Sequence, residues 1–264
     1  MLMKLLKYDL RWIYKVVAVF YCLALFFSIT SFCLSNVENS VLFSILYNIS
    51  NGFALAMVAN CIINCLIRAW VRFRNNIYKD EAYLTHTIPV SRSKIYLSKV
   101  LAAIICMFTS VAVSAFCLFV CYYNNESIAD ILKTLFDSAS DTLSLSAFWL
   151  FAVFLAEIFF QLVFILLLGY NGIILGHKSN KNKMLNSIII GFAMYMIFNM
   201  VSVTAVFAAG LFNNQIMNLI KTSDAIDTSV LKDLLLCAIA LYAVYNVVLY
   251  IMGSKLLKKG VDIE

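Results

Sequence analysis

The chain has 264 residues, of which 63% are hydrophobic and only 13% are charged, and its mean hydropathy is +0.91. Soluble domains carry about 45–50% apolar and about 25% charged residues, so a soluble core of this size could not hide so much apolar surface. The composition therefore excludes a soluble globular domain, and we predict an all-α polytopic membrane protein. The apolar runs are far longer than the roughly 10-residue alternating strands of a membrane barrel.

The first 13 residues, MLMKLLKYDLRWI, predict an amphipathic helix. At 100° per residue its apolar face holds Leu2, Leu6, Leu10 and Ile13, and its basic face holds Lys4, Lys7 and Arg11. A helix of this kind lies in the membrane interface with its cations toward the lipid headgroups.

Six apolar segments follow, each long enough to cross a bilayer. They cover about residues 14–34, 41–67, 95–122, 143–171, 185–212 and 234–253. The fourth apolar run continues to Gly176, so we expect Gly169, Gly172 and Gly176 to mark either a break or a small-residue packing face. A short helix is expected in the acidic loop before the fourth span. No separate soluble domain is expected, so residues 1–264 form a single six-span domain.

The charges predict the orientation of these spans. The N-terminus, the 68–99 segment, the 177–183 loop and the tail share one face and hold all but three of the 20 basic residues; the exceptions are Lys133, Lys221 and Lys232. Because loops rich in Lys and Arg stay in the cytoplasm, we expect both termini there. Basic residues gathered at span ends also favour membrane topology over nucleic-acid binding.

Four polar side chains inside the spans are candidates for a translocation path. Asn60 and Asn64 lie one helical turn apart in the second span, and Glu157 and Gln161 are spaced in the same way in the fourth. A carboxylate within a span is costly unless it faces the bundle interior. The alternative is structural, with the asparagines joining helices and a protonated Glu157 bonded to a neighbouring helix.

The polar segment 68–94 joins the second and third spans, and it contains the only proline, Pro89. We expect one short helix over 75–85 that carries Tyr78, Glu81 and Leu84–Thr85 along one face. Pro89 disfavours helix at Ile88, and Ser91 caps the next helix. Such a projecting helix suits docking to a cytoplasmic partner, and the alternative is an ordinary solvated loop.

The run from Tyr78 to Lys99, YKDEAYLTHTIPVSRSKIYLSK, resembles the ABC-2-type permease subunits of bacterial ABC exporters, in particular the small permeases linked to bacteriocin and lantibiotic immunity. The shared features are an acidic and aromatic stretch, a Leu-Thr step before proline, and a lysine that opens the third span. The six-span layout and the amphipathic start are also similar to that family.

The resemblance implies a coupling helix that contacts a separate cytoplasmic ATPase. Its coupling residues in this chain are Tyr78, Asp80, Glu81, Tyr83, Leu84 and Pro89. It also implies a second permease copy or paralogue, ATP and Mg in the partner ATPase rather than in this chain, location in the bacterial cell membrane, and export of a peptide or another amphiphile.

No catalytic constellation is visible, so an enzyme is not expected. The segment 172–179 lacks the spacing of a phosphate-binding loop, because Gly176 is one place early and His177 intervenes before Lys178. The eight cysteines lie mostly in apolar runs, as small hydrophobic residues would, and neither they nor the histidines are spaced as metal ligands. Two alternatives remain open: an ion-coupled secondary transporter, and a membrane scaffold or sensor that transports nothing.

Overall fold

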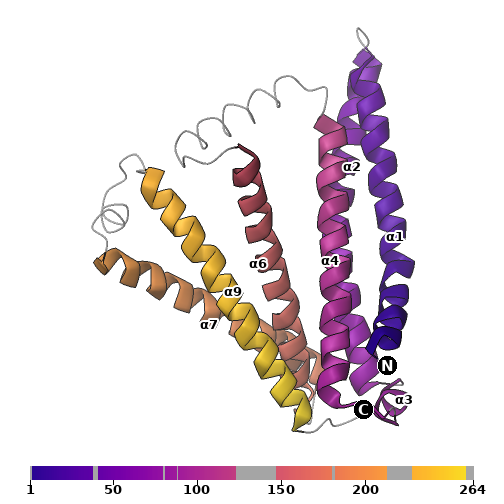
Figure 1. Cartoon of the computed structure of the whole chain (residues 1–264). Coiled ribbons are helices and arrows are strands. Elements are labelled where there is room, and N and C mark those ends of the chain that lie inside the picture. The colour runs from indigo at the N-terminus through magenta and orange to yellow at the C-terminus, as the bar shows by residue number, and fades with distance from the viewer. Residues whose placement is uncertain are drawn as a thin grey trace. The chain divides into compact units, whose positions relative to one another are not determined.

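The computed structural model describes residues 2–37, 41–79, 81–87, 89–122, 147–179, 182–212 and 228–259. Within these ranges the only regular elements are helices (Figure 1). They are α1 (Leu2–Ser35), α2 (Val41–Tyr78), α3 (Ala82–Thr87), α4 (Arg92–Tyr122), α6 (Ala147–Gly176), α7 (Lys183–Phe212) and α9 (Thr228–Lys258). All except α3 are long and apolar enough to cross a membrane. The predicted all-α fold with six spans is confirmed, and the chain is built as a multi-pass membrane protein.

Two helices are longer than the spans predicted from apolar runs. The amphipathic segment at the N-terminus continues without a break into the first span, so that both form α1. The second span does not end at residue 67, because α2 continues through the basic stretch RAWVRFRNNIY to Tyr78. This stretch has no glycine or proline to stop the helix. The short helix expected in the acidic loop lies outside the described residues.

The helix predicted over residues 75–85 is wrong in one respect, because the chain forms two helices there. α2 ends at Tyr78, a turn follows in which the Ala82 amide donates to the Lys79 carbonyl at 2.7 Å, and α3 begins at Ala82. The Glu81 carboxylate lies 2.7 Å from Arg72 Nη1. Nine residues of straight helix would rise about 13.5 Å. The contact therefore requires the chain to turn back after Tyr78.

The first of two compact units contains α1, α2, α3 and α4. Its apolar core packs Ala24 of α1 against Val58 and Cys61 of α2 and Cys117 of α4. Hydroxyl groups add polar links between the same helices: Tyr14 Oη lies 2.7 Å from Thr109 Oγ1, and Tyr21 Oη lies 2.7 Å from Ser110 Oγ. In an apolar environment such bonds hold helices in register.

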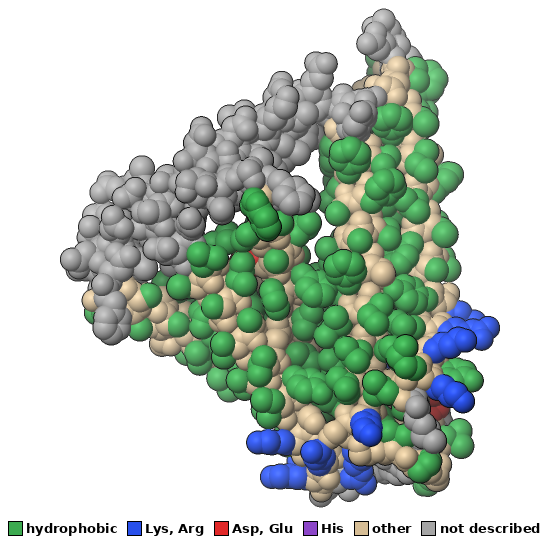
Figure 2. All heavy atoms as spheres, in the orientation of Figure 1, with side chains coloured by type: hydrophobic (Ala, Val, Ile, Leu, Met, Phe, Trp, Pro, Cys, Tyr) green, Lys and Arg blue, Asp and Glu red, His purple; other side chains and the backbone are tan. Residues whose placement is uncertain are grey.

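The second unit packs α6 against both α7 and α9. On the α9 side, buried Asn171 donates from Nδ2 to the Leu249 carbonyl at 3.0 Å, and Asn246 donates to the Phe160 carbonyl at 3.0 Å. None of the residues in the most apolar stretch of α7 is buried. Outside its contact with α6, this helix exposes apolar side chains that require lipid or another protein around them. Figure 2 shows apolar side chains over the visible length of the helices, with Lys and Arg toward one end.

Two glycines of α6 allow close contact with α7. A Cβ atom at Gly172 would lie 2.8 Å from the Ser187 carbonyl oxygen and 3.1 Å from Gly191 Cα, and one at Gly176 would clash with the backbone of Ser187. α6 runs through Gly169 and Gly172 without interruption and ends at Gly176. Of the two interpretations of these glycines, the packing face is therefore confirmed for Gly172 and Gly176.

Alanine at Gly172 or Gly176 is expected to separate α6 from α7. Overpacking of this kind costs about 1–3 kcal/mol of unfolding free energy. The control is Gly52→Ala in α2, where the added methyl group meets no atom within 4 Å. That change should be neutral or stabilising, because alanine favours helix. Unfolding of the purified chain by sodium dodecyl sulfate measures both, and equal stability of all three variants would contradict the close packing.

Candidate functional site

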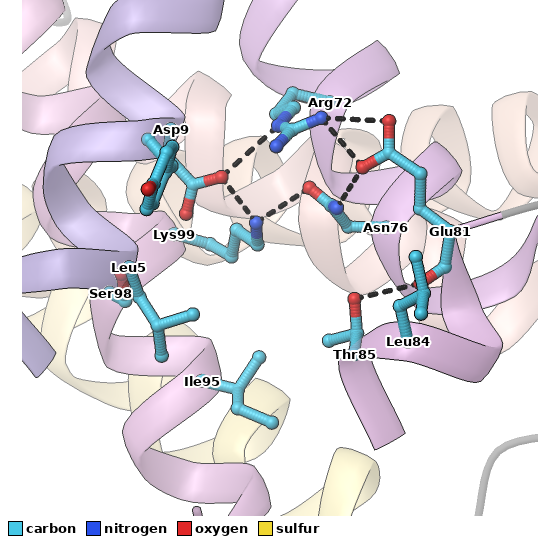
Figure 3. Close-up of a pocket in the computed structure, with 11 residues that line it drawn as sticks. Leu5, Asp9, Arg72, Asn76, Glu81, Leu84, Thr85, Ile95, Ser98 and Lys99 are labelled. Atoms are coloured by element: carbon cyan, nitrogen blue, oxygen red, sulfur yellow. Dashed lines mark hydrogen bonds and ion pairs between the residues drawn. The ribbon is translucent and has the colours of Figure 1, made fainter. Parts of the chain in front are cut away.

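Five polar side chains meet at one end of the first unit, beside a cavity of about 210 Å³ (Figure 3). α2 ends where α1 and α4 begin, so residues distant in sequence come together there. The cluster consists of Asp9 from α1, Arg72 and Asn76 from α2, Glu81 before α3, and Lys99 from α4. We call this set the charge network.

The Asp9 carboxylate is the centre of the network. Asp9 is 2% exposed and Lys99 is 6% exposed. A single carboxylate oxygen, Oδ1, accepts from Lys99 Nζ at 2.5 Å and from Arg72 Nε at 3.1 Å. Each helix of the first unit's core thus contributes one charge to the same buried contact.

Glu81 connects α3 to this centre. Arg72 Nη1 donates to Glu81 Oε1 at 3.0 Å and to Oε2 at 2.7 Å. Asn76 completes the connection, because its Oδ1 accepts from Lys99 Nζ at 2.6 Å while its Nδ2 donates to Glu81 Oε2. Glu81 is the most exposed member of the network, and the Thr85 side chain beside it is buried.

The Arg72 guanidinium also stacks on an aromatic ring. Its Cζ atom lies 5.2 Å from the centre of the Trp12 ring, and Arg68 approaches the same ring at 5.6 Å. Arginine suits this position because its planar group can serve two carboxylates at its edge while its face rests on a ring. A lysine has a single ammonium centre and could not reproduce this arrangement.

The network carries two positive and two negative charges, so it is balanced. Buried ions lose hydration, and only their mutual contacts offset that loss. Removing one partner leaves an uncompensated buried charge, which is far more costly than removing a complete pair. The network therefore specifies how α1, α2, α3 and α4 meet.

The structure separates the predicted coupling residues into an inner and an outer group. Tyr78 is buried at 2% exposed and Glu81 turns to Arg72, whereas Tyr83 and Leu84 are 68% and 71% exposed. The prediction that Tyr78, Glu81 and Leu84–Thr85 lie along one face of a single helix is wrong, because α2 ends at Tyr78 and α3 begins at Ala82. Pro89 is exposed, and Asp80 lies outside the described residues.

The candidate path residues lie in different units. The amides of Asn60 and Asn64 donate to carbonyls of their own helix one turn earlier, those of Ala56 and Asn60, both at 3.0 Å. In the second unit, Glu157 is half-buried, and exposed Gln161 is hydrogen-bonded to Tyr242 of α9. The role of these four residues in a path stays a prediction.

Sequence reasoning missed Asp9 as a functional residue, although the sequence contains a signal for it. It is the only acidic residue among the first 37. At 100° per residue, Asp9 falls on the apolar face of the N-terminal helix with Leu2, not on the basic face with Lys7. An acid on an apolar face needs a buried partner, but the sequence does not say which cation supplies it.

Comparison of this chain with known protein families, with characterised proteins and with solved structures found no match. The site is therefore interpreted from its own residues. Among the described residues, no three His, Cys, Asp or Glu side chains gather as metal ligands would. The geometry of the charge network suits a mechanical link between a surface helix and the bundle.

Asparagine at Asp9 is expected to destabilise the chain strongly. It would leave Lys99 and Arg72 with only Glu81 to balance them, and breaking a buried pair typically costs about 3–5 kcal/mol. The double variant Asp9→Asn/Lys99→Met restores the charge balance and should lose less stability than Asp9→Asn alone. Denaturant unfolding of the purified chain measures this difference.

Exposed Lys94 provides the matched control, since Lys94→Met removes a nearby charge that has no place in the network. It should change the unfolding free energy by no more than about 0.5 kcal/mol. If the loss of unfolding free energy in Asp9→Asn/Lys99→Met equals the sum of the losses in the two single variants, the balanced network is refuted.

Proposed function

We propose that this chain is the transmembrane permease subunit of an ABC exporter, driven by ATP that a separate cytoplasmic subunit hydrolyses. In this proposal α3 is the coupling helix, both termini are cytoplasmic, and the bilayer is a bacterial cell membrane. ATP and Mg bind to the partner subunit, and a second permease copy or paralogue completes the transporter. The cargo is a peptide or another amphiphile.

One observation carries the proposal: α3 exposes large apolar side chains while a buried network fixes its start. Tyr83 and Leu84 stand on a six-residue helix at the polar end of the first unit, outside the long apolar spans. Lipid does not explain exposed apolar residues in a polar region. A protein partner recognises exposed apolar side chains that are held in a fixed orientation.

The contacts also supply a route for force. A displacement of α3 acts on Glu81, then on Arg72 and Asn76, and through them on Asp9 of α1 and Lys99 of α4. The three helices that receive this displacement, α1, α2 and α4, are all of membrane-spanning length. Closure of an ATPase against α3 would therefore be transmitted to the three long helices of the first unit together.

The test uses an ATP-binding-cassette subunit isolated by co-purification with this chain, with the permease in lipid nanodiscs. Alanine at Tyr83 or Leu84 should weaken its binding roughly tenfold or more, because exposed apolar anchors dominate such interfaces. Kd from biolayer interferometry and stimulated ATP hydrolysis are the two measurements. Glu81 is avoided here, since its loss would disturb the network as well as the docking surface.

The control is Leu185→Ala, which removes an exposed leucine from the start of α7 in the second unit. This variant should bind the ATPase as the unaltered chain does. Unchanged binding and hydrolysis in both α3 variants would eliminate α3 as the coupling helix.

A further inference from the structure

The cavity beside the charge network is lined by network residues and by apolar side chains. α1 contributes Leu5 and Tyr8, α4 contributes Ile95 and Ser98, and α3 contributes Leu84. Figure 3 shows Leu5 and Ile95 on one side of this space and Leu84 with Thr85 on the other. The volume of about 210 Å³ is enough for one side chain or a similar small group.

Two buried polar atoms at this cavity have no hydrogen-bond partner. Asp9 Oδ2 is one of them, because both cations bind Oδ1 instead. Ser98 Oγ is the other, on a residue that is 1% exposed. Buried polar groups in proteins nearly always have partners, so these two atoms indicate that something enters the cavity.

The chemistry of the cavity limits what can enter. A carboxylate oxygen only accepts hydrogen bonds, so the entering group must donate one. The charges of the network already balance, and an added cation would leave a net positive charge in a buried place. Leu5, Leu84 and Ile95 also line the cavity, so an entering group meets apolar side chains as well as the carboxylate. The fitting group is therefore a neutral donor, a hydroxyl or an amide, at the end of an apolar stem.

The position of the cavity indicates where that group comes from. Leu84 lines the cavity and is also, like Tyr83, an exposed apolar residue of α3. Tyr8 of α1 lines the cavity and is exposed as well. A protein that covers α3 would therefore cover the mouth of the cavity too.

We propose that the cytoplasmic partner inserts one neutral, hydrogen-bonding side chain into this cavity, where it donates to Asp9 Oδ2 and meets Ser98 Oγ. A tyrosine, threonine or glutamine has the required chemistry. The anchor would contact the carboxylate that holds α1, α2 and α4 together, so partner binding would be sensed directly by the network. This inference rests on the proposed function, because it takes the ATPase as the partner.

The test fills the cavity from the permease side. Leu5→Trp places a large ring in the space, and Leu6→Trp makes the same change at a neighbouring residue that does not line the cavity. With the ATPase described above, Leu5→Trp should raise Kd roughly tenfold and Leu6→Trp less than about twofold. Thermal unfolding of each permease alone checks that both variants fold.

A second measurement does not depend on filling the cavity. A benzophenone amino acid at Leu5, irradiated in the assembled complex, should cross-link to an ATPase segment that contains a hydroxyl or amide side chain. Changing that side chain to its apolar isostere, such as Tyr→Phe, should then weaken binding to the unaltered permease.

The outcomes separate the two proposals. If Leu84→Ala weakens ATPase binding while Leu5→Trp binds normally and the cross-link misses the ATPase, the anchor is refuted and the coupling helix stands. If neither variant affects binding, the proposed function fails first. A cross-link to phospholipid alone would also overturn the anchor, because it would show a lipid in the cavity.

Discussion

The first unit depends on one physical constraint, the burial of the Asp9 carboxylate between two cations. A carboxylate this deep is tolerated only where its charge is met, and here Lys99 and Arg72 both bind the same oxygen. Since the three residues belong to α4, α2 and α1, satisfying that one atom fixes the end of the bundle. Arg72 then extends the constraint to Glu81, so the short α3 takes its position from the same contact.

This constraint separates the residues that hold α3 from those that α3 presents. Glu81 binds to the bundle and Thr85 is buried, while Tyr83 and Leu84 are exposed. A helix of six residues has little stability of its own, so its orientation must come from tertiary contacts. The proposed docking surface and the cavity beside Asp9 are thus adjacent, because Leu84 belongs to both.

Much of the fold was predictable because lipid imposes a simple pattern. Long apolar runs gave six spans, and Pro89 with Ser91 correctly separated the segment before α4, which begins at Arg92. The charge network was not predictable, since Asp9 is 63 residues from Arg72 and 90 from Lys99. The prediction of one helix over 75–85 failed for a related reason. Glu81 binds back to Arg72, and helical periodicity in the sequence does not indicate that contact. The sequence predicted Tyr83 and Leu84 as coupling residues, and that role stays a prediction, whereas Asp9 and Asn76 were identified only in the structure.

The Arg72 guanidinium fixes α3 to the bundle through its contacts with Asp9 and Glu81. Hydrogen exchange of residues 82–87, measured by mass spectrometry on the chain in nanodiscs, tests it with Arg72→Lys and Arg68→Lys. Both variants alter a cation on the Trp12 ring, but only Arg72 reaches Asp9 and Glu81. The account predicts faster exchange across α3 in Arg72→Lys and unchanged exchange in Arg68→Lys. Equal protection of α3 in both variants would contradict it.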